Sequence, residues 1–213
     1  MTNDLIDRRQ AVLGPNVPTF YDNPVHLVKG EGVWVWDANG HKYLDCYNNV
    51  PHVGHCHPHV VSAISAQAGT LNTHTRYLHD GIINYAERLI AKFHKGLDQL
   101  IMVCSGSEAN DIALRMAQAV TGKTGIISTD NTYHGNTMAV SQLSSRKPPI
   151  GGYAANIRHV SAPDTLRPVG GNAKTQAQAF AQEIQKAIND LEVSGHGFSG
   201  FLFCPTFANE GLP

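Results

Sequence analysis

Two serines flank a glycine at Ser105, Gly106 and Ser107, between a short apolar run and an amphipathic segment. This order predicts a strand, a turn of small residues and the N-terminus of a helix. The first N–H groups of a helix have no partner within it, and the helix dipole favours negative charge at that end. Gly106 lets a ligand approach the backbone closely, and both serine hydroxyls can donate hydrogen bonds. We therefore expect a phosphate group to bind here.

The same tripeptide is also compatible with an ordinary turn between a strand and a helix. In that interpretation Ser107 caps the helix, an interaction that stabilises a helix by about 1 kcal/mol. The tripeptide by itself does not separate the two interpretations.

A second group of chemistry-bearing residues, Tyr133, His134 and Gly135, follows the apolar residues 126–127. In a parallel sheet, the strands before the two motifs would end at the same carboxyl edge, where ligands of open α/β sheets bind. An aromatic ring can lie against a planar cofactor, while a glycine keeps the backbone clear of it. By itself this motif also fits a polar loop with one surface tyrosine. Two such motifs at one sheet edge favour a binding site.

The elements around these motifs alternate between short strands and helices. A β-hairpin is expected over residues 26–46, because β-prone residues flank an Asp-Ala-Asn-Gly turn. The alternation predicts an α/β fold whose mostly parallel sheet is covered by helices on both faces. The expected strands are 100–104, 124–129, 157–160 and 200–204, and the expected helices are 58–68, 80–94, 108–120 and 175–191, with Asp80 as the N-cap of the second helix.

Composition excludes several classes of partner. The 213 residues carry a net charge of −1, which gives no basic field for nucleic acid and no anchor for an anionic membrane. No run approaches the roughly 20 apolar residues that span a bilayer. The chain starts without a basic and apolar leader, and its four cysteines are isolated in the sequence. We therefore expect a cytoplasmic protein with reduced thiols.

Four histidines, His52, His55, His57 and His59, are spaced so that their imidazoles could in principle converge on zinc. No carboxylate or paired cysteine lies at a matching spacing, and Pro58 starts a helix that would splay the later side chains. We interpret this stretch as a structural loop and expect no metal site.

Four features, in this order, resemble the class III aminotransferases of the ornithine or 4-aminobutyrate type. They are the hairpin at 32–45, Gly-His-Cys-His-Pro at 54–58, Ser-Gly-Ser-Glu-Ala-Asn at 105–110 and Tyr-His-Gly-Asn-Thr at 133–137. The resemblance covers nearly the whole chain from about residue 23 and corresponds to the N-terminal half of that family. It implies pyridoxal 5′-phosphate as cofactor, a homodimer with active sites at the subunit interface, and the fold type I of aspartate aminotransferase.

The resemblance also implies roles for the residues of the two motifs. Gly106 and Ser107 would donate to the cofactor phosphate, with Ser105 at the turn. Tyr133 would stack on the pyridine ring, and His134 would lie beside it. These roles coincide with those expected from the chemistry of the residues.

Substrate contacts follow from the same resemblance. The family's loop that corresponds to residues 47–53 lines the substrate entrance, which implies contacts from Asn48, Asn49 and Val50. Arg76 could form a bidentate pair with a substrate carboxylate or phosphate. A surface arginine in a loop fits the same sequence equally well.

Two parts of the family's architecture are expected. Residues 1–67 correspond to an N-terminal segment with a β-hairpin that belongs to the small domain, and residues 68–213 to an incomplete cofactor-binding large domain. In the family, the Schiff-base lysine and the acid that pairs with the pyridine nitrogen lie beyond the position of residue 213. The sheet is therefore expected to be incomplete at the C-terminus, and this chain alone to be inactive. Cys204 stands where the family has a glutamate, and Glu210 and Gly211 keep part of the closing motif.

The function implied for the whole protein is transfer of an amino group between an amine or amino acid and an oxo acid. One alternative is lyase chemistry on a phosphorylated amino alcohol, because a branch of the family acts in that way. Another is a non-catalytic, Rossmann-like phosphate- or nucleotide-binding module. Against this last alternative, residues 105–107 are not G-x-G-x-x-G, and the acidic residue expected about 20 positions later is matched only by Asp130, next to the second motif.

Overall fold

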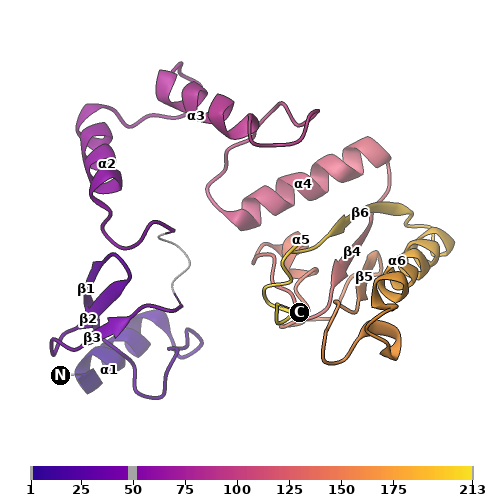
Figure 1. Ribbon diagram of the computed structural model, residues 1–213, viewed down its shortest axis with the longest axis horizontal. Helices are drawn as coiled ribbons and strands as arrows, with labels where there is room; N and C mark the ends of the chain where they lie inside the picture. The colour runs from indigo at the N-terminus through magenta and orange to yellow at the C-terminus, as the bar shows by residue number, and fades with distance from the viewer. Residues whose placement is uncertain (1, 48–51, 213) are drawn as a thin grey trace. The chain divides into compact units, whose positions relative to one another are not determined.

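The computed structural model describes residues 2–47 and 52–212 (Figure 1). These residues form two compact units, the first ending at Tyr85 and the second starting at Ala86. The expected domain division after residue 67 concerns the whole protein and stays a prediction.

The first unit is built around a small antiparallel sheet, in the order β1-β2-β3. This arrangement confirms the expected hairpin and adds a strand to it. The elements of this part of the chain are α1 (Thr2–Leu13), β1 (Leu27–Glu31), β2 (Trp34–Asp37), β3 (Lys42–Leu44), α2 (Pro58–Thr70) and α3 (Asp80–Ile90), the last of which spans the boundary between the units.

The turn between β2 and β3 is organised by the buried carboxylate of Asp37. Its Oδ1 accepts the N–H groups of Asn39 and His41, both at 2.9 Å, and its Oδ2 lies 3.0 Å from the Tyr43 hydroxyl and from Nδ1 of His41. Burial raises the pKa of Asp37. The hydrogen bonds from His41, Tyr43 and Asn39 have the larger, opposite effect and lower this pKa to about 2. The folded hairpin thus prefers the ionised carboxylate.

We expect the hairpin to lose stability in acid. A carboxyl whose pKa is depressed by folding contributes stability above its unfolded pKa of about 3.9, and this contribution is lost as the pH falls toward about 2. The chain's two tryptophans, Trp34 and Trp36, both lie in β2, so tryptophan fluorescence reports on this unit. Fluorescence-detected urea unfolding should show the midpoint falling between about pH 4 and about pH 2. The fall should be smaller in Asp37→Asn, and an equal fall in both proteins would contradict this role of Asp37.

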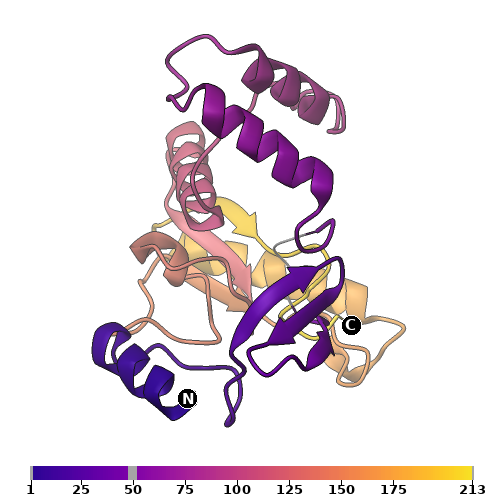
Figure 2. The ribbon, with the colours of Figure 1, turned by 90° about the vertical axis from the view of Figure 1, so that its left-hand side faces the viewer.

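The second unit contains a parallel sheet in the order β5-β4-β6, which confirms the predicted α/β class (Figure 1). Helices pack on both faces of this sheet (Figure 2). The elements are α4 (Gly106–Thr121), β4 (Gly125–Thr129), α5 (Met138–Ser141), β5 (Ile157–Val160), the 3₁₀ turn η1 (Val169–Gly171), α6 (Gln176–Val193) and β6 (Phe198–Leu202).

The two faces of the sheet follow from the alternation of side chains along β4. Ile126 packs in a cluster with side chains of α4 and of the α5 region, including Leu114. Its neighbour Ile127 packs in a second cluster with Leu191 of α6. Both isoleucines are at most 2 % exposed. A continuous apolar strand thus serves two layers of helix, as expected for a central strand of a parallel sheet.

The expected strand at 100–104 is wrong. These residues form no strand and pair with no other strand in the described ranges, and Leu100, Ile101 and Met102 are all exposed. Strand geometry needs a neighbouring strand to satisfy its backbone N–H and C=O groups. Among the described strands, β6 pairs only with β4, so an apolar run alone does not produce a strand here.

Several expected boundaries are also corrected. The helix predicted to reach residue 94 ends at Ile90, after which Lys92 and Phe93 make shorter i→i−3 backbone hydrogen bonds. His79, and not Asp80, occupies its cap position, because the His79 ring nitrogen accepts the N–H of Gly81 at 3.1 Å. The last strand lies at Phe198–Leu202, two residues earlier than predicted.

Candidate functional site

The N-terminus of α4 is held by two reciprocal hydrogen bonds. Ser105 is extended and its Oγ accepts the N–H of Glu108 at 3.1 Å, while the Glu108 carboxylate accepts the N–H of Cys104 at 2.8 Å. This pattern resembles a capping box. The interpretation of Ser107 as the cap is therefore wrong, because the helix already begins at Gly106 and Ser105 is the last extended residue.

Three donors remain at this helix end. Within residues 2–47 and 52–212, the backbone N–H groups of Gly106 and Ser107 have no acceptor. They lie at the positive end of the helix dipole. The Ser107 Oγ accepts the N–H of Asn136 at 3.1 Å, which leaves its own proton free to donate. Two N–H groups and one hydroxyl on a single helix turn form the donor set that binds a phosphate.

The second motif lies directly against this turn. A Cβ built on Gly135 would lie 2.5 Å from Ser107 Oγ and 2.9 Å from Ser107 Cα, and Gly135 has a φ of +147°. Only glycine permits this approach and this backbone conformation. The amide of Asn110 also donates to the carbonyl of His134 at 2.8 Å. The structure thus brings together the two motifs that the sequence predicted to meet.

His134 is fixed from several directions. Its N–H donates to the buried Ser144 hydroxyl at 3.0 Å, and its Nε2 lies 3.3 Å from Thr132 Oγ1. Burial lowers the pKa of His134, and the nearby charge of Glu210 opposes this effect only in part. The imidazole is therefore neutral at neutral pH. Tyr133, by contrast, is 50 % exposed, so its ring is open to a ligand.

The loop after β6 reaches the end of β4. Thr129 Oγ1 donates to Glu210 Oε1 at 2.7 Å, while Glu210 Oε2 is buried with no partner in the described part of the chain. Hydrogen bonds from the backbone of Ala208 and from the Thr206 hydroxyl lower the pKa of the Cys204 thiol. Sequence reasoning singled out Cys204 and Glu210 but missed the contact with Thr129. A threonine at the last position of a predicted strand was the available signal.

The predicted substrate contacts have different outcomes. Asn48, Asn49 and Val50 lie outside the described residues. Arg76 is exposed in the first unit, where its backbone N–H donates to the His74 ring at 3.2 Å. Its role as a substrate contact stays a prediction.

The histidine-rich stretch has a structural contact at its centre. His55 Nε2 lies 2.7 Å from Asp45 Oδ2, and His55 exchanges two backbone hydrogen bonds with Gly32. In the described ranges, no three or more His, Cys, Asp or Glu side chains are arranged to hold a metal ion. No helix there has the length and apolarity needed to cross a membrane.

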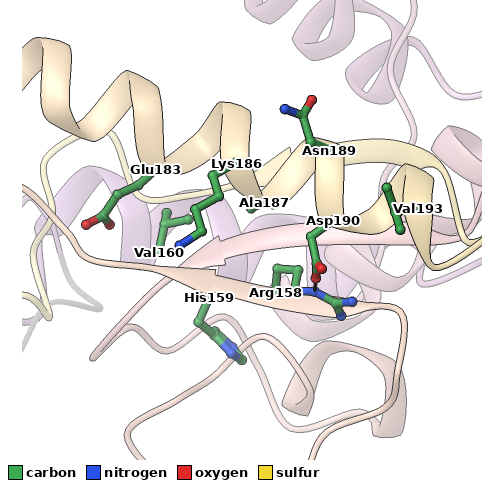
Figure 3. Close-up of a pocket in the computed structure, with 9 residues that line it drawn as sticks. All are labelled: Arg158, His159, Val160, Glu183, Lys186, Ala187, Asn189, Asp190 and Val193. Carbon is green, nitrogen blue, oxygen red and sulfur yellow. Dashed lines mark hydrogen bonds and ion pairs between the residues drawn. The ribbon is translucent and has the colours of Figure 1, made fainter.

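A cavity of about 530 Å³ lies between β5 and α6 (Figure 3). Arg158 of β5 forms an ion pair with Asp190 of α6 across it, and Lys186 points toward the same space. None of the sequence-predicted site residues lines this cavity. The candidate site is therefore the one at the N-terminus of α4.

Comparison with known proteins identifies the family of the chain. The model of the class-III aminotransferase family matches residues 17–211. The chain is 35 % identical over 210 residues to an alanine–glyoxylate aminotransferase 2-like protein of Drosophila melanogaster, covering 93 % of this chain and 42 % of that protein. It is 30 % identical over 212 residues to ethanolamine-phosphate phospho-lyase homolog 1 of Caenorhabditis elegans, covering 93 % and 45 %.

Solved structures are also similar to this chain over nearly its whole length. A phospholyase from Arthrobacter, in complex with phosphoethanolamine, is 43 % identical with a TM-score of 0.88, covering 96 % of this chain and 48 % of that chain. Taurine:2-oxoglutarate aminotransferase from Bifidobacterium kashiwanohense, in complex with PLP and glutamate, shares the fold at 22 % identity and a TM-score of 0.73, covering 95 % and 48 %. The chain thus spans about half the length of these relatives. It belongs to the class III aminotransferase family, which has fold type I and uses pyridoxal phosphate as cofactor.

Proposed function

We propose that this chain supplies the phosphate-binding part of a pyridoxal phosphate site. The whole protein would transfer an amino group between an amine or amino acid and an oxo acid, and would act as a homodimer. One observation carries the proposal. The N–H groups of Gly106 and Ser107, which have no acceptor among the described residues, lie at the N-terminus of a helix that packs against Gly135, in a chain that belongs to this family.

Each residue of the site has a role in binding or orientation. The N–H groups of Gly106 and Ser107 and the Ser107 hydroxyl donate to the cofactor phosphate, and Ser105 fixes the turn that presents them. The exposed ring of Tyr133 stacks on the pyridine ring. His134 is held beside it by its backbone contacts, and because its pKa is lowered by burial it adds no positive charge there. When bound, the cofactor supplies an electron sink for cleavage of bonds next to the amino group.

A second candidate function is lyase chemistry on a phosphorylated amino alcohol. The 43 % identity to the Arthrobacter phospholyase supports it, while the 35 % identity to the alanine–glyoxylate aminotransferase 2-like protein supports amino transfer. The cofactor site is the same in both candidates. They differ in the substrate group that must be recognised beside it.

Ser107→Ala is expected to weaken cofactor binding. Loss of a hydroxyl that donates to an anionic oxygen costs about 1.5–3 kcal/mol, which raises Kd by about tenfold or more. Pyridoxine 5′-phosphate is a suitable probe for titration calorimetry, since it has no aldehyde and does not react with lysines. Ser194→Ala is the matched control, because Ser194 lies at the C-terminus of α6 and donates to the Leu191 carbonyl.

Equal affinities of the unmodified chain and Ser107→Ala would remove Ser107 from the site. Binding of NAD without binding of pyridoxine 5′-phosphate would favour the Rossmann-like alternative over a cofactor site of this family.

A further inference from the structure

The loop that carries Tyr133 is held in place by side chains of other segments. Residues 131–136 form neither a helix nor a strand. Several of their backbone groups bind serine and asparagine side chains, which come from the first turn of α4 and from the residues that follow α5. The position of Tyr133 therefore depends on a small number of side-chain hydrogen bonds.

Two side chains of α4 bind this loop. Ser107 and Asn110 are three residues apart, so they lie on the same face of the helix. Both are partly buried, whereas the two residues between them are exposed. Ser107 Oγ accepts the N–H of Asn136 at 3.1 Å, and the Asn110 amide donates to the carbonyl of His134 at 2.8 Å. One helix face thus holds the loop at two points.

Two consecutive serines after α5 hold the same loop. Ser144 Oγ accepts the N–H of His134 at 3.0 Å, and Ser145 Oγ accepts the N–H of Asn131 at 2.6 Å. The N–H of His134 belongs to the peptide group that follows Tyr133. The backbone on both sides of Tyr133 is therefore bound to side chains of another segment.

The Tyr133 side chain has no such support of its own. It is 50 % exposed, and its hydroxyl makes no hydrogen bond to any residue in the ranges 2–47 and 52–212. The preceding residue, Thr132, is fully buried. The direction of the Tyr133 ring thus follows from the backbone, and the backbone follows from the hydrogen bonds to its neighbours.

We propose that Asn110 is a positioning residue of the cofactor site. Its amide fixes the loop relative to the N-terminus of α4, so that the phosphate donors and the Tyr133 ring can contact one cofactor molecule at the same time. The proposal rests on the proposed function, which assigns the phosphate to α4 and the pyridine ring to Tyr133. Ser107 cannot be tested for this role alone, because its hydroxyl also donates to the phosphate in that function.

The expected contribution of Asn110 is preorganisation. Without its hydrogen bond, the loop has to be ordered when the cofactor binds, and this cost reduces the affinity. The loss applies to a ligand that contacts both the helix end and Tyr133. Inorganic phosphate contacts the helix end alone, so its affinity should not depend on Asn110.

The test therefore compares two probes. In Asn110→Ala, the Kd of pyridoxine 5′-phosphate, measured by titration calorimetry, should rise by about tenfold. The Kd of inorganic phosphate, measured from the amide signals of Gly106 and Ser107, should stay within about twofold of that of the unmodified chain. Alanine favours a helix more than asparagine does, so the substitution does not weaken α4. Asn189→Ala, at an exposed position of α6, is the control and should leave both Kd values unchanged.

A double-mutant cycle tests whether Asn110 acts through Tyr133. Tyr133→Ala removes the ring that Asn110 is proposed to position. In that background, Asn110→Ala should change the Kd of pyridoxine 5′-phosphate by less than about twofold. A loss of about tenfold in both backgrounds would overturn the proposal, as would an equal loss of affinity for the two probes, because the helix end itself would then be damaged.

The outcomes also separate this proposal from the proposed function. If pyridoxine 5′-phosphate binds the unmodified chain and Asn110→Ala equally well, the positioning role is overturned and the proposed function stands. If pyridoxine 5′-phosphate does not bind the unmodified chain, the proposed function is overturned, and the positioning role of Asn110 with it.

Discussion

Replacing Gly135 by alanine is expected to weaken cofactor binding strongly and to destabilise the second unit. The added Cβ would lie 2.5 Å from the Ser107 Oγ and 2.9 Å from its Cα, and the φ of +147° at Gly135 strains any residue with a side chain. Overpacking costs roughly 1–3 kcal/mol, and backbone strain adds a cost of similar size. We expect the free energy of unfolding to fall by about 2–4 kcal/mol, and the affinity for pyridoxine 5′-phosphate to fall by about a hundredfold or more.

Gly151→Ala is the matched control for this variant. Gly151 also has a positive φ, of +91°, but an added Cβ there would meet nothing within 4 Å. It should therefore show only the cost of backbone strain, about 1 kcal/mol, with unchanged affinity for the probe. Urea unfolding followed by far-UV circular dichroism gives the stabilities. If the Gly135→Ala variant binds the probe as tightly as the unmodified chain, the packing of Gly135 against Ser107 does not shape the site.

Of the substitutions proposed for this chain, Leu191→Ala is expected to lower the free energy of unfolding the most. Leu191 is fully buried in the cluster that joins α6 to Ile127 and Val160 of the sheet. Truncation of a buried leucine to alanine costs about 3–5 kcal/mol, because the lost transfer free energy is increased by the cavity left behind. Such a loss is a large part of the stability of a small unit.

Val193→Ala, on the same helix, is the control for Leu191→Ala. Val193 is 88 % exposed, so its truncation should change the free energy of unfolding by at most about 0.5 kcal/mol. The urea midpoints of the two variants, measured by far-UV circular dichroism, test the contrast. Equal midpoints would contradict the packing of α6 on the sheet.

The parts of the site that sequence predicted are those with local signals. The turn of small residues before an amphipathic helix, and the aromatic–histidine–glycine motif after a β-prone run, are both readable from adjacent residues. The expected reason for their meeting, two parallel strands that end at one edge of the sheet, was wrong for the first motif, because residues 100–104 form no strand. The structure confirms that Ser107 and Gly135 meet, although the distance between them was not predictable, since it depends on how α4 packs against the loop after β4.

The wrong predictions concern features that depend on contacts between distant residues or on exact helix boundaries. The run at 100–104 has the composition of a strand, but a strand exists only with a partner, and partners are set by tertiary structure. The hydrogen bond between Thr129 and Glu210 joins the end of β4 to the loop after β6, so a local pattern shows the threonine at a strand end but not its partner. The cap of α4 is Ser105 and not Ser107. Sequence patterns place the start of a helix only within a few residues, so they did not identify the capping serine.

The most direct test of the proposed cofactor site is the backbone amide spectrum of the ¹⁵N-labelled chain during titration with pyridoxine 5′-phosphate. The N–H groups of Gly106 and Ser107 are proposed to donate to the phosphate, so their signals should show the largest changes in chemical shift, followed by those of Tyr133 and Gly135. The result that would contradict the account is saturable binding that leaves the Gly106 and Ser107 signals unmoved while signals elsewhere in the chain shift.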